Sequence, residues 1–67
     1  MRVRLNGNPQ DLPDGALLAD AFERLGIGDP RGVAVALDGE VVPRSRWSTT
    51  QVTEGQAIEI LRAVQGG

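Results

Sequence analysis

The sequence predicts an α+β fold, a mixed sheet of about five strands with one main helix packed across one face. Three observations support this prediction. Several short segments alternate apolar and polar residues, as half-buried strands do, and one longer segment has the apolar spacing of a helix. Asn-Gly and Asp-Gly pairs, which favour tight hairpin turns, separate the predicted strands. The expected order along the chain is β-β-α-β-β-β.

The N-terminal segment is predicted to form a hairpin. Val3 and Leu5 would lie on one face of its first strand, with the intervening arginine on the other face. The Asn-Gly pair that follows tolerates positive φ and indicates a turn over residues 6–9. Residues 10–13 are expected to return as a short second strand.

The next segment, residues 14–28, changes to a helical period. Asp14 is the best available residue to cap the helix at its N-terminus, and Gly26 suits the position just after its C-terminus. Ile27 can then fold back onto the helix end. Polar side chains such as Asp20 are expected to be solvated. One helical face would carry the apolar residues Leu17, Leu18, Ala21, Phe22 and Leu25.

A second hairpin is predicted after the helix. Apolar residues alternate from Val33 to Leu37, as in a half-buried strand. The pair Asp38-Gly39 strongly favours a tight turn, and residues 40–42 would form the returning strand.

The last third of the chain is predicted to hold a crossover and a final strand. Residues 44–52 have no clear period, so a crossover with a helical turn is expected, held in place by Trp47 and Val52. Residues 57–64 alternate again and would form the last strand, with two isoleucines, Ile58 and Ile60, facing the core.

This order fits the β-grasp arrangement, in which the first and last strands lie side by side and parallel at the centre of the sheet. The apolar faces of both strands are consistent with a central position. Residues 1–64 are therefore expected to form one domain, and residues 65–67 a flexible C-terminal tail that contains the Gly-Gly pair.

The composition argues against several classes of function. The chain has no cysteine and no histidine, so it lacks a thiol nucleophile, the usual general base near neutral pH and the commonest metal ligands. It is therefore expected to be no enzyme and to bind no metal or cofactor. The net charge of −2 argues against nucleic acid as a partner. No apolar run approaches the roughly 20 residues of a membrane span, and no signal-peptide pattern opens the chain, so a cytoplasmic setting is expected.

The glycines at positions 66 and 67 are the most suggestive feature of the sequence. They have no side chains, so they can enter a slot that is too narrow for any other residue. The α-carboxylate of Gly67 would be an anion at pH 7 and a poor electrophile. Adenylation by ATP would supply a leaving group, and attack by a persulfide would then give a C-terminal thiocarboxylate.

The sequence resembles the ThiS family of thiamine-biosynthesis sulfur carriers, essentially from end to end. The most specific piece is VPRSRW, residues 42–47, which lies about twenty residues before the final Gly-Gly. One departure is Ala16, where a Thr or Ser helix cap is expected. The other segments that carry the resemblance are MRVRLNG, LLADAFERLGI, VAVALDGEVVPRSRW and TEGQAIEILRAVQGG.

The resemblance implies a ubiquitin-like β-grasp fold and a covalent role for the tail. By position, Gly67 would bear the acyl-adenylate and then the thiocarboxylate. Gly66, which has no side chain, would pass with it into a narrow slot of the partner. The implied partners are an E1-like adenylating enzyme of the ThiF/MoeB type, which uses ATP and Mg, a persulfide sulfur donor, and a thiazole synthase of the ThiG type.

Four further residues are candidates for partner docking. Leu61 would point outward if the two isoleucines of the last strand face the core, and Ala63 would lie beside it. Arg44 and Arg46 could form a polar contact for a partner, or could simply be solvated. For Trp47 the favoured interpretation is a plug at the edge of the core.

Two alternative functions stay open at this stage. The chain could carry sulfur in another pathway, as the small subunit of molybdopterin synthase does. It could also be a non-catalytic ubiquitin-like interaction module that binds through the face of Leu61 and has an idle tail. An RNA-binding role is poorly supported, because the chain has one Trp and one Phe for stacking.

Overall fold

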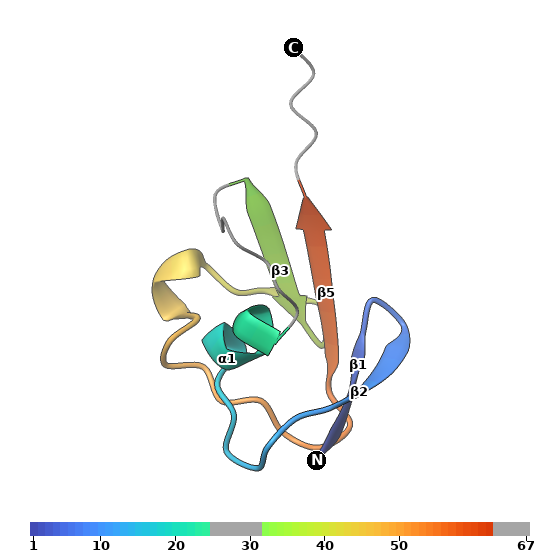
Figure 1. Ribbon diagram of the computed structural model, residues 1–67. Coiled ribbons are helices and arrows are strands. Elements are labelled where there is room, and N and C mark those ends of the chain that lie inside the picture. Colours follow the sequence, from blue (N-terminus) through green and yellow to red (C-terminus); the bar gives the residue numbers. More distant parts are fainter. Residues whose placement is uncertain (25–31, 63–67) are drawn as a thin grey trace.

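The computed structural model of the chain describes residues 1–24 and 32–62 (Figure 1). Its elements follow the predicted order β-β-α-β-β-β, with one turn of 3-10 helix, η1, before the last strand. The elements are β1 (Arg2–Leu5), β2 (Asn8–Asp11), α1 (Leu18–Arg24), β3 (Val33–Leu37), β4 (Glu40–Val41), η1 (Arg44–Arg46) and β5 (Ala57–Arg62).

The strands form one five-stranded mixed sheet in the order β2-β1-β5-β3-β4, and α1 packs across one face (Figure 1). β1 and β5 are parallel neighbours, with Leu5 in register with Ile58. On its other side β5 pairs antiparallel with β3, where Val35 faces Ile60. The predicted central, parallel placement of the first and last strands is therefore confirmed.

Both hairpins turn through two residues with positive φ. The values are 47° and 85° at Asn6 and Gly7, and 49° and 85° at Asp38 and Gly39. Such turns match the right-handed twist of the strands they join. The predicted turn over residues 6–9 was too long: β2 already begins at Asn8, because the two-residue turn leaves the next residues free to pair.

The helix begins later than its apolar pattern suggested. α1 buries Leu18, Ala21 and Phe22, as predicted. Leu17 lies just before the helix, is half-buried, and forms an isolated bridge with Gln51. The remaining residues of the predicted apolar face and helix end, Leu25, Gly26 and Ile27, lie outside the described residues.

Backbone groups of the crossover satisfy the first donors of α1. Leu18 and Ala19 donate their N–H groups to the carbonyls of Thr50 and Trp47, at 2.9 and 3.1 Å. A Thr or Ser cap at Ala16 is therefore unnecessary, because the donors that it would satisfy already have partners. Ala16 itself is buried, and its carbonyl accepts the N–H of Val52 at 3.0 Å.

The predicted helix cap at Asp14 was wrong. The carboxylate of Asp20, in the first turn, accepts the N–H of Leu17 at 2.8 Å and so reaches back over the helix start. Asp14 instead accepts a hydrogen bond from the N-terminal ammonium group of Met1 at 3.3 Å. The side chain that caps α1 thus comes from inside the helix and not from the residues before it.

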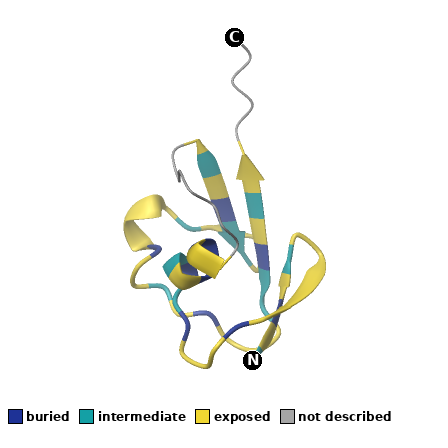
Figure 2. Ribbon diagram, viewed as in Figure 1, coloured by how far each residue is buried: buried dark blue, intermediate teal, exposed yellow. Residues whose placement is uncertain are grey.

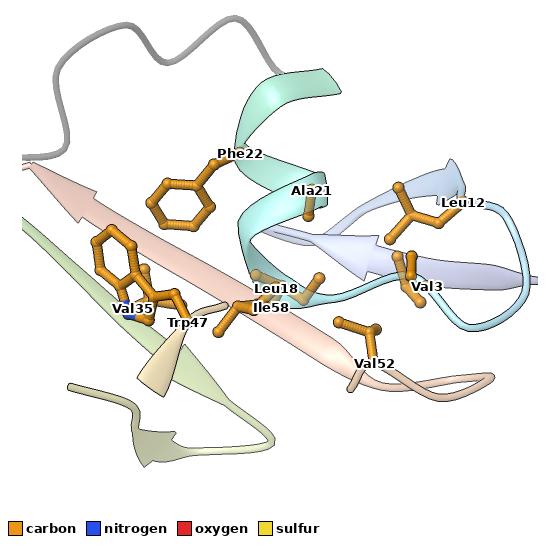
Figure 3. Close-up of a cluster of buried hydrophobic side chains, with 10 residues drawn as sticks. Val3, Leu12, Leu18, Ala21, Phe22, Val35, Trp47, Val52 and Ile58 are labelled. Atoms are coloured by element: carbon orange, nitrogen blue, oxygen red, sulfur yellow. The ribbon is translucent and has the colours of Figure 1, made fainter. Parts of the chain in front are cut away.

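The core lies between α1 and the sheet, and the crossover closes one side (Figures 2 and 3). Trp47 is buried and its indole N–H donates to the carbonyl of Val42 at 2.9 Å, which confirms the predicted plug. Val52 is also buried, as expected. The buried hydrophobic residues are Val3, Leu12, Ala16, Leu18, Ala21, Phe22, Val35, Trp47, Val52 and Ile58.

Candidate functional site

The fold directs attention to the C-terminal end of β5, because the two glycines follow it in the sequence. β5 ends at Arg62, which is in register with Val33 of β3. Ala63, Gly66 and Gly67, together with the predicted domain boundary at residue 64, lie outside the described residues. Their proposed roles therefore stay predictions, and the described site consists of the strand that leads to them.

Leu61 lies on the face of the sheet that α1 does not cover. Ile58 is buried and Ile60 is half-buried on the core face, so the alternation of β5 turns Leu61 outward. Its side chain is 69% exposed, and Ala34 lies opposite it on β3. The outward orientation expected from the sequence is therefore observed.

A second exposed apolar residue was missed by the sequence analysis. Val41 on β4 is 74% exposed and pairs with Ala36, which in turn pairs with Glu59. Cross-strand partners share a face of the sheet, so Val41 lies on the same side as Leu61. Val42, the residue after β4, is half-buried and donates its N–H to the carbonyl of Val35 at 2.8 Å, so the side chain of Val41 before it faces the opposite way. We call Ala34, Val41, Glu59 and Leu61 the open face.

Arg44 and Arg46 lie near the Val41 end of the open face and away from Leu61, and Arg46 lines a shallow pocket together with Val41. Both are exposed in η1, the short helix that follows the edge strand β4. In the sheet, β3 and β4 follow β5, and η1 comes directly after β4 in the chain. The structure therefore does not bring the two arginines together with Leu61, and any partner that contacts both regions would have to span the β4 edge.

The first residues of both hairpin turns hold β5 by their side chains. On the β3 side, an oxygen of the Asp38 carboxylate accepts the N–H of Ala57 at 2.9 Å. On the β1 side, the Asn6 amide bonds the backbone of Ile60. The sequence predicts a turn conformation for Asn6 and Asp38, but their bonds to the last strand were not predicted from it. Their polar side chains were the available signal, since Asn and Asp readily bond backbone groups near turns.

The described residues contain neither a metal-binding cluster nor a membrane-spanning helix. Within residues 1–24 and 32–62, no group of three or more acidic side chains lies close enough to hold a metal ion. No helix in this part of the chain has the length and hydrophobicity that crossing a membrane requires.

A five-stranded mixed sheet with parallel first and last strands and one helix across its face defines a ubiquitin-like β-grasp domain. The model of the ThiS family matches residues 3–67. The chain therefore belongs to the ThiS family, the sulfur carriers of thiamine biosynthesis that its sequence resembles.

Two solved structures from Geobacter metallireducens are similar to this chain. A crystal structure of the thiamine biosynthesis protein ThiS is 29% identical, with a TM-score of 0.86 and coverage of 100% of both chains. An NMR solution structure of a thiamine biosynthesis protein is 30% identical, with a TM-score of 0.80, and the match covers 100% of this chain and 88% of that one. Among curated proteins, none matches.

Proposed function

We propose that this chain carries sulfur as a thiocarboxylate on Gly67 and donates it for thiazole formation in thiamine biosynthesis. The observation that carries the proposal is the family match, which extends through Gly66 and Gly67 to residue 67. A carrier of this kind is a co-substrate of partner enzymes and needs no catalytic residue of its own. The absence of cysteine and histidine from the sequence is consistent with that role.

The proposed chemistry starts with activation of the tail. The carboxylate of Gly67 attacks the α-phosphate of ATP on an E1-like adenylating enzyme, pyrophosphate leaves, and an acyl-adenylate forms. ATP and Mg belong to that partner. The glycine residue leaves the acyl carbon open to attack, because no side chain shields it.

Sulfur then replaces the adenylate. The terminal sulfur of a persulfide attacks the acyl carbon, AMP leaves, and an acyl disulfide forms. A thiol cleaves the disulfide bond, becomes joined to the former persulfide carrier, and releases the thiocarboxylate. A thiazole synthase would accept this sulfur. In these steps the thiol supplies the two electrons that reduce the terminal sulfur of the persulfide. The acyl carbon of the chain therefore undergoes no net redox change.

The described structure supports this proposal through the strand that leads to the tail. Leu61 is exposed five residues before Gly66, and Val41 is exposed on the same face, with Ala36 and Glu59 between them. A partner that covers this face would remove both apolar side chains from water, which favours binding. We propose that the adenylating enzyme binds this open face, and that Ala63, Arg44 and Arg46 add further contacts. A cytoplasmic setting remains part of the proposal.

Mass spectrometry of the intact protein tests the covalent step. After incubation with the adenylating enzyme, ATP, Mg and a persulfide donor, the protein should gain the mass difference between sulfur and oxygen. Fragmentation should place the gain at Gly67. A variant that lacks Gly67 is the matched control and should stay unmodified. If that variant gains sulfur as the full chain does, the assignment of Gly67 is wrong.

A further inference from the structure

The parallel neighbour of β5 stops before β5 does. β1 pairs with only the first residues of β5, Ala57 and Ile58, although β5 continues to Arg62. β3 accompanies β5 to its last residue on the opposite side. In Figure 1 β5 continues past the tip of the β1–β2 hairpin. The strand would therefore have one unsupported side where it approaches the tail.

The side chain of Asn6 takes over at this point. The backbone N–H of Asn6 donates to the carbonyl of Ile58 at 2.9 Å, which continues the ladder of β1. The side-chain oxygen then accepts the N–H of Ile60 at 2.8 Å, and the side-chain nitrogen donates to the carbonyl of Ile60 at 3.3 Å. One side-chain amide thus satisfies both backbone groups of Ile60, which a continued parallel strand would satisfy through two different residues.

This contact acts directly before the residues that the proposed function uses. Ile60 precedes Leu61, the exposed residue of the open face, and Arg62 is the last described residue before the tail. We infer that Asn6 is a positioning residue for acyl transfer at Gly67: it holds the end of β5 in the direction that a docked partner needs. The inference rests on the proposed function.

The turn geometry does not by itself require the asparagine amide. A type I′ turn needs positive φ at its first central residue, and glycine meets that requirement as well as asparagine does. The Asn6→Gly substitution therefore keeps the turn and removes both bonds to Ile60. Asn6→Asp keeps an acceptor for the N–H of Ile60 and loses the donor.

The other hairpin supplies a matched control. Asp38 occupies the same turn position, with φ 49° against 47° for Asn6, and its carboxylate also bonds the β5 backbone. Its carboxylate accepts from the N–H of Ala57 and from the side chain of Gln56, at the start of β5 and away from the tail. Asp38→Gly therefore removes two side-chain hydrogen bonds, as Asn6→Gly does, but at the opposite end of the strand.

Steady-state kinetics of thiocarboxylate formation test the inference. The purified full-length wild type and the three variants are titrated against the adenylating enzyme, below the unfolding temperature of each variant. Without Asn6 the partner must order the end of β5 on binding, so Asn6→Gly should raise KM about tenfold, the loss expected for two hydrogen bonds. kcat should change less than KM. Asn6→Asp should give an intermediate KM, and Asp38→Gly should leave KM near the wild-type value.

Hydrogen exchange of the same proteins links the kinetics to the strand. Exchange of the Ile60 amide should accelerate in Asn6→Gly, whereas exchange of the Ala57 amide should accelerate in Asp38→Gly. Equal KM values for the two glycine variants would overturn the inference. An unchanged KM for Asn6→Gly, in an assay in which the wild-type chain does gain sulfur, would overturn it as well. A wild-type chain that gains no sulfur overturns the proposed function, and this inference with it.

Discussion

The rings of Phe22 and Trp47 meet with their centroids 4.3 Å apart and their planes tilted by 46°. Phe22 lies on α1, and Trp47 directly follows η1, so this pair joins the helix to the crossover (Figure 3). The helix start is joined to the crossover as well, since Ala19 donates to the carbonyl of Trp47. One tryptophan therefore connects two segments that contact the sheet from the same side.

Replacement of Trp47 by alanine should be the most damaging single change in the core. It removes the aromatic pair and the bond to Val42, and truncation of a buried Trp typically costs about 3–5 kcal/mol. Small domains are stable by only about 5–15 kcal/mol, so this change would remove a large share of the free energy of unfolding. Urea titration followed by circular dichroism measures the loss. A loss below 1 kcal/mol would contradict the plug role.

Capping of α1 by Asp20 can be separated from the predicted but incorrect cap at Asp14. Asp20→Ala removes the acceptor for the Leu17 N–H and should cost about 1 kcal/mol. Asp14→Ala removes an exposed contact to the N-terminal ammonium group and should cost less than 0.5 kcal/mol. Thermal unfolding of both variants in one buffer makes the comparison. Equal losses would argue against the cap at Asp20.

A charge at the open face should weaken partner binding without unfolding the domain. Leu61→Lys adds one positive charge to a side chain that is 69% exposed, so stability should change by less than about 0.5 kcal/mol. Affinity for the adenylating enzyme should fall at least about tenfold, because a charge would be buried against an apolar contact.

The matched control for Leu61→Lys is Glu23→Gln. It raises the net charge by the same one unit, at an exposed position of α1. Isothermal titration calorimetry measures both affinities. A loss of affinity that is the same in both variants would point to net charge and would remove Leu61 from the docking surface.

The two arginines of η1 should act mainly on the rate of association. If Arg44 and Arg46 meet an acidic region of a partner, their joint replacement by glutamine should slow association and flatten its dependence on ionic strength. Stopped-flow mixing with the adenylating enzyme at several salt concentrations measures this dependence. An unchanged salt dependence would remove both residues from the interface.

A side chain at position 66 should hinder entry of the tail into the partner's active site. Gly66→Ala should leave the unfolding free energy unchanged and lower kcat/KM for thiocarboxylate formation at least about tenfold, because a methyl group narrows the fit in the partner's slot. Gln65→Ala, one residue earlier, is the control and should retain activity. If both alanine variants are fully active, the tail does not enter a tight slot.

The sequence predicts those parts of the fold that depend on local patterns. Asn6-Gly7 and Asp38-Gly39 specify two hairpin turns, and the alternation around Val35 and Ile58 places both residues in the core. These features are predictable because the turn preference and the period of two act over a few neighbouring residues.

Two of the features that were missed depend on residues far apart in the chain. The start of α1 is set by the carbonyls of Trp47 and Thr50, which no local pattern near the helix reveals. Asn6 bonds Ile60 across a separation of 54 residues. Val41 was missed because a strand of two residues is too short to show an alternation of its own. Tertiary partners therefore decide the details closest to the proposed site.

Pro9 gives the outer edge of β2 a further property. Leu12 donates its N–H inward to the carbonyl of Met1, and alternation along an antiparallel pair then turns the nitrogen of residue 9 away from β1. A proline at that position has no hydrogen to offer to a strand of a neighbouring molecule. At the other margin, β4 has only two residues. Both edges of the sheet thus disfavour hydrogen-bonded pairing with the edge strand of another copy. The chain should therefore resist edge-to-edge aggregation at concentrations where a protein with a long, flat edge strand would aggregate.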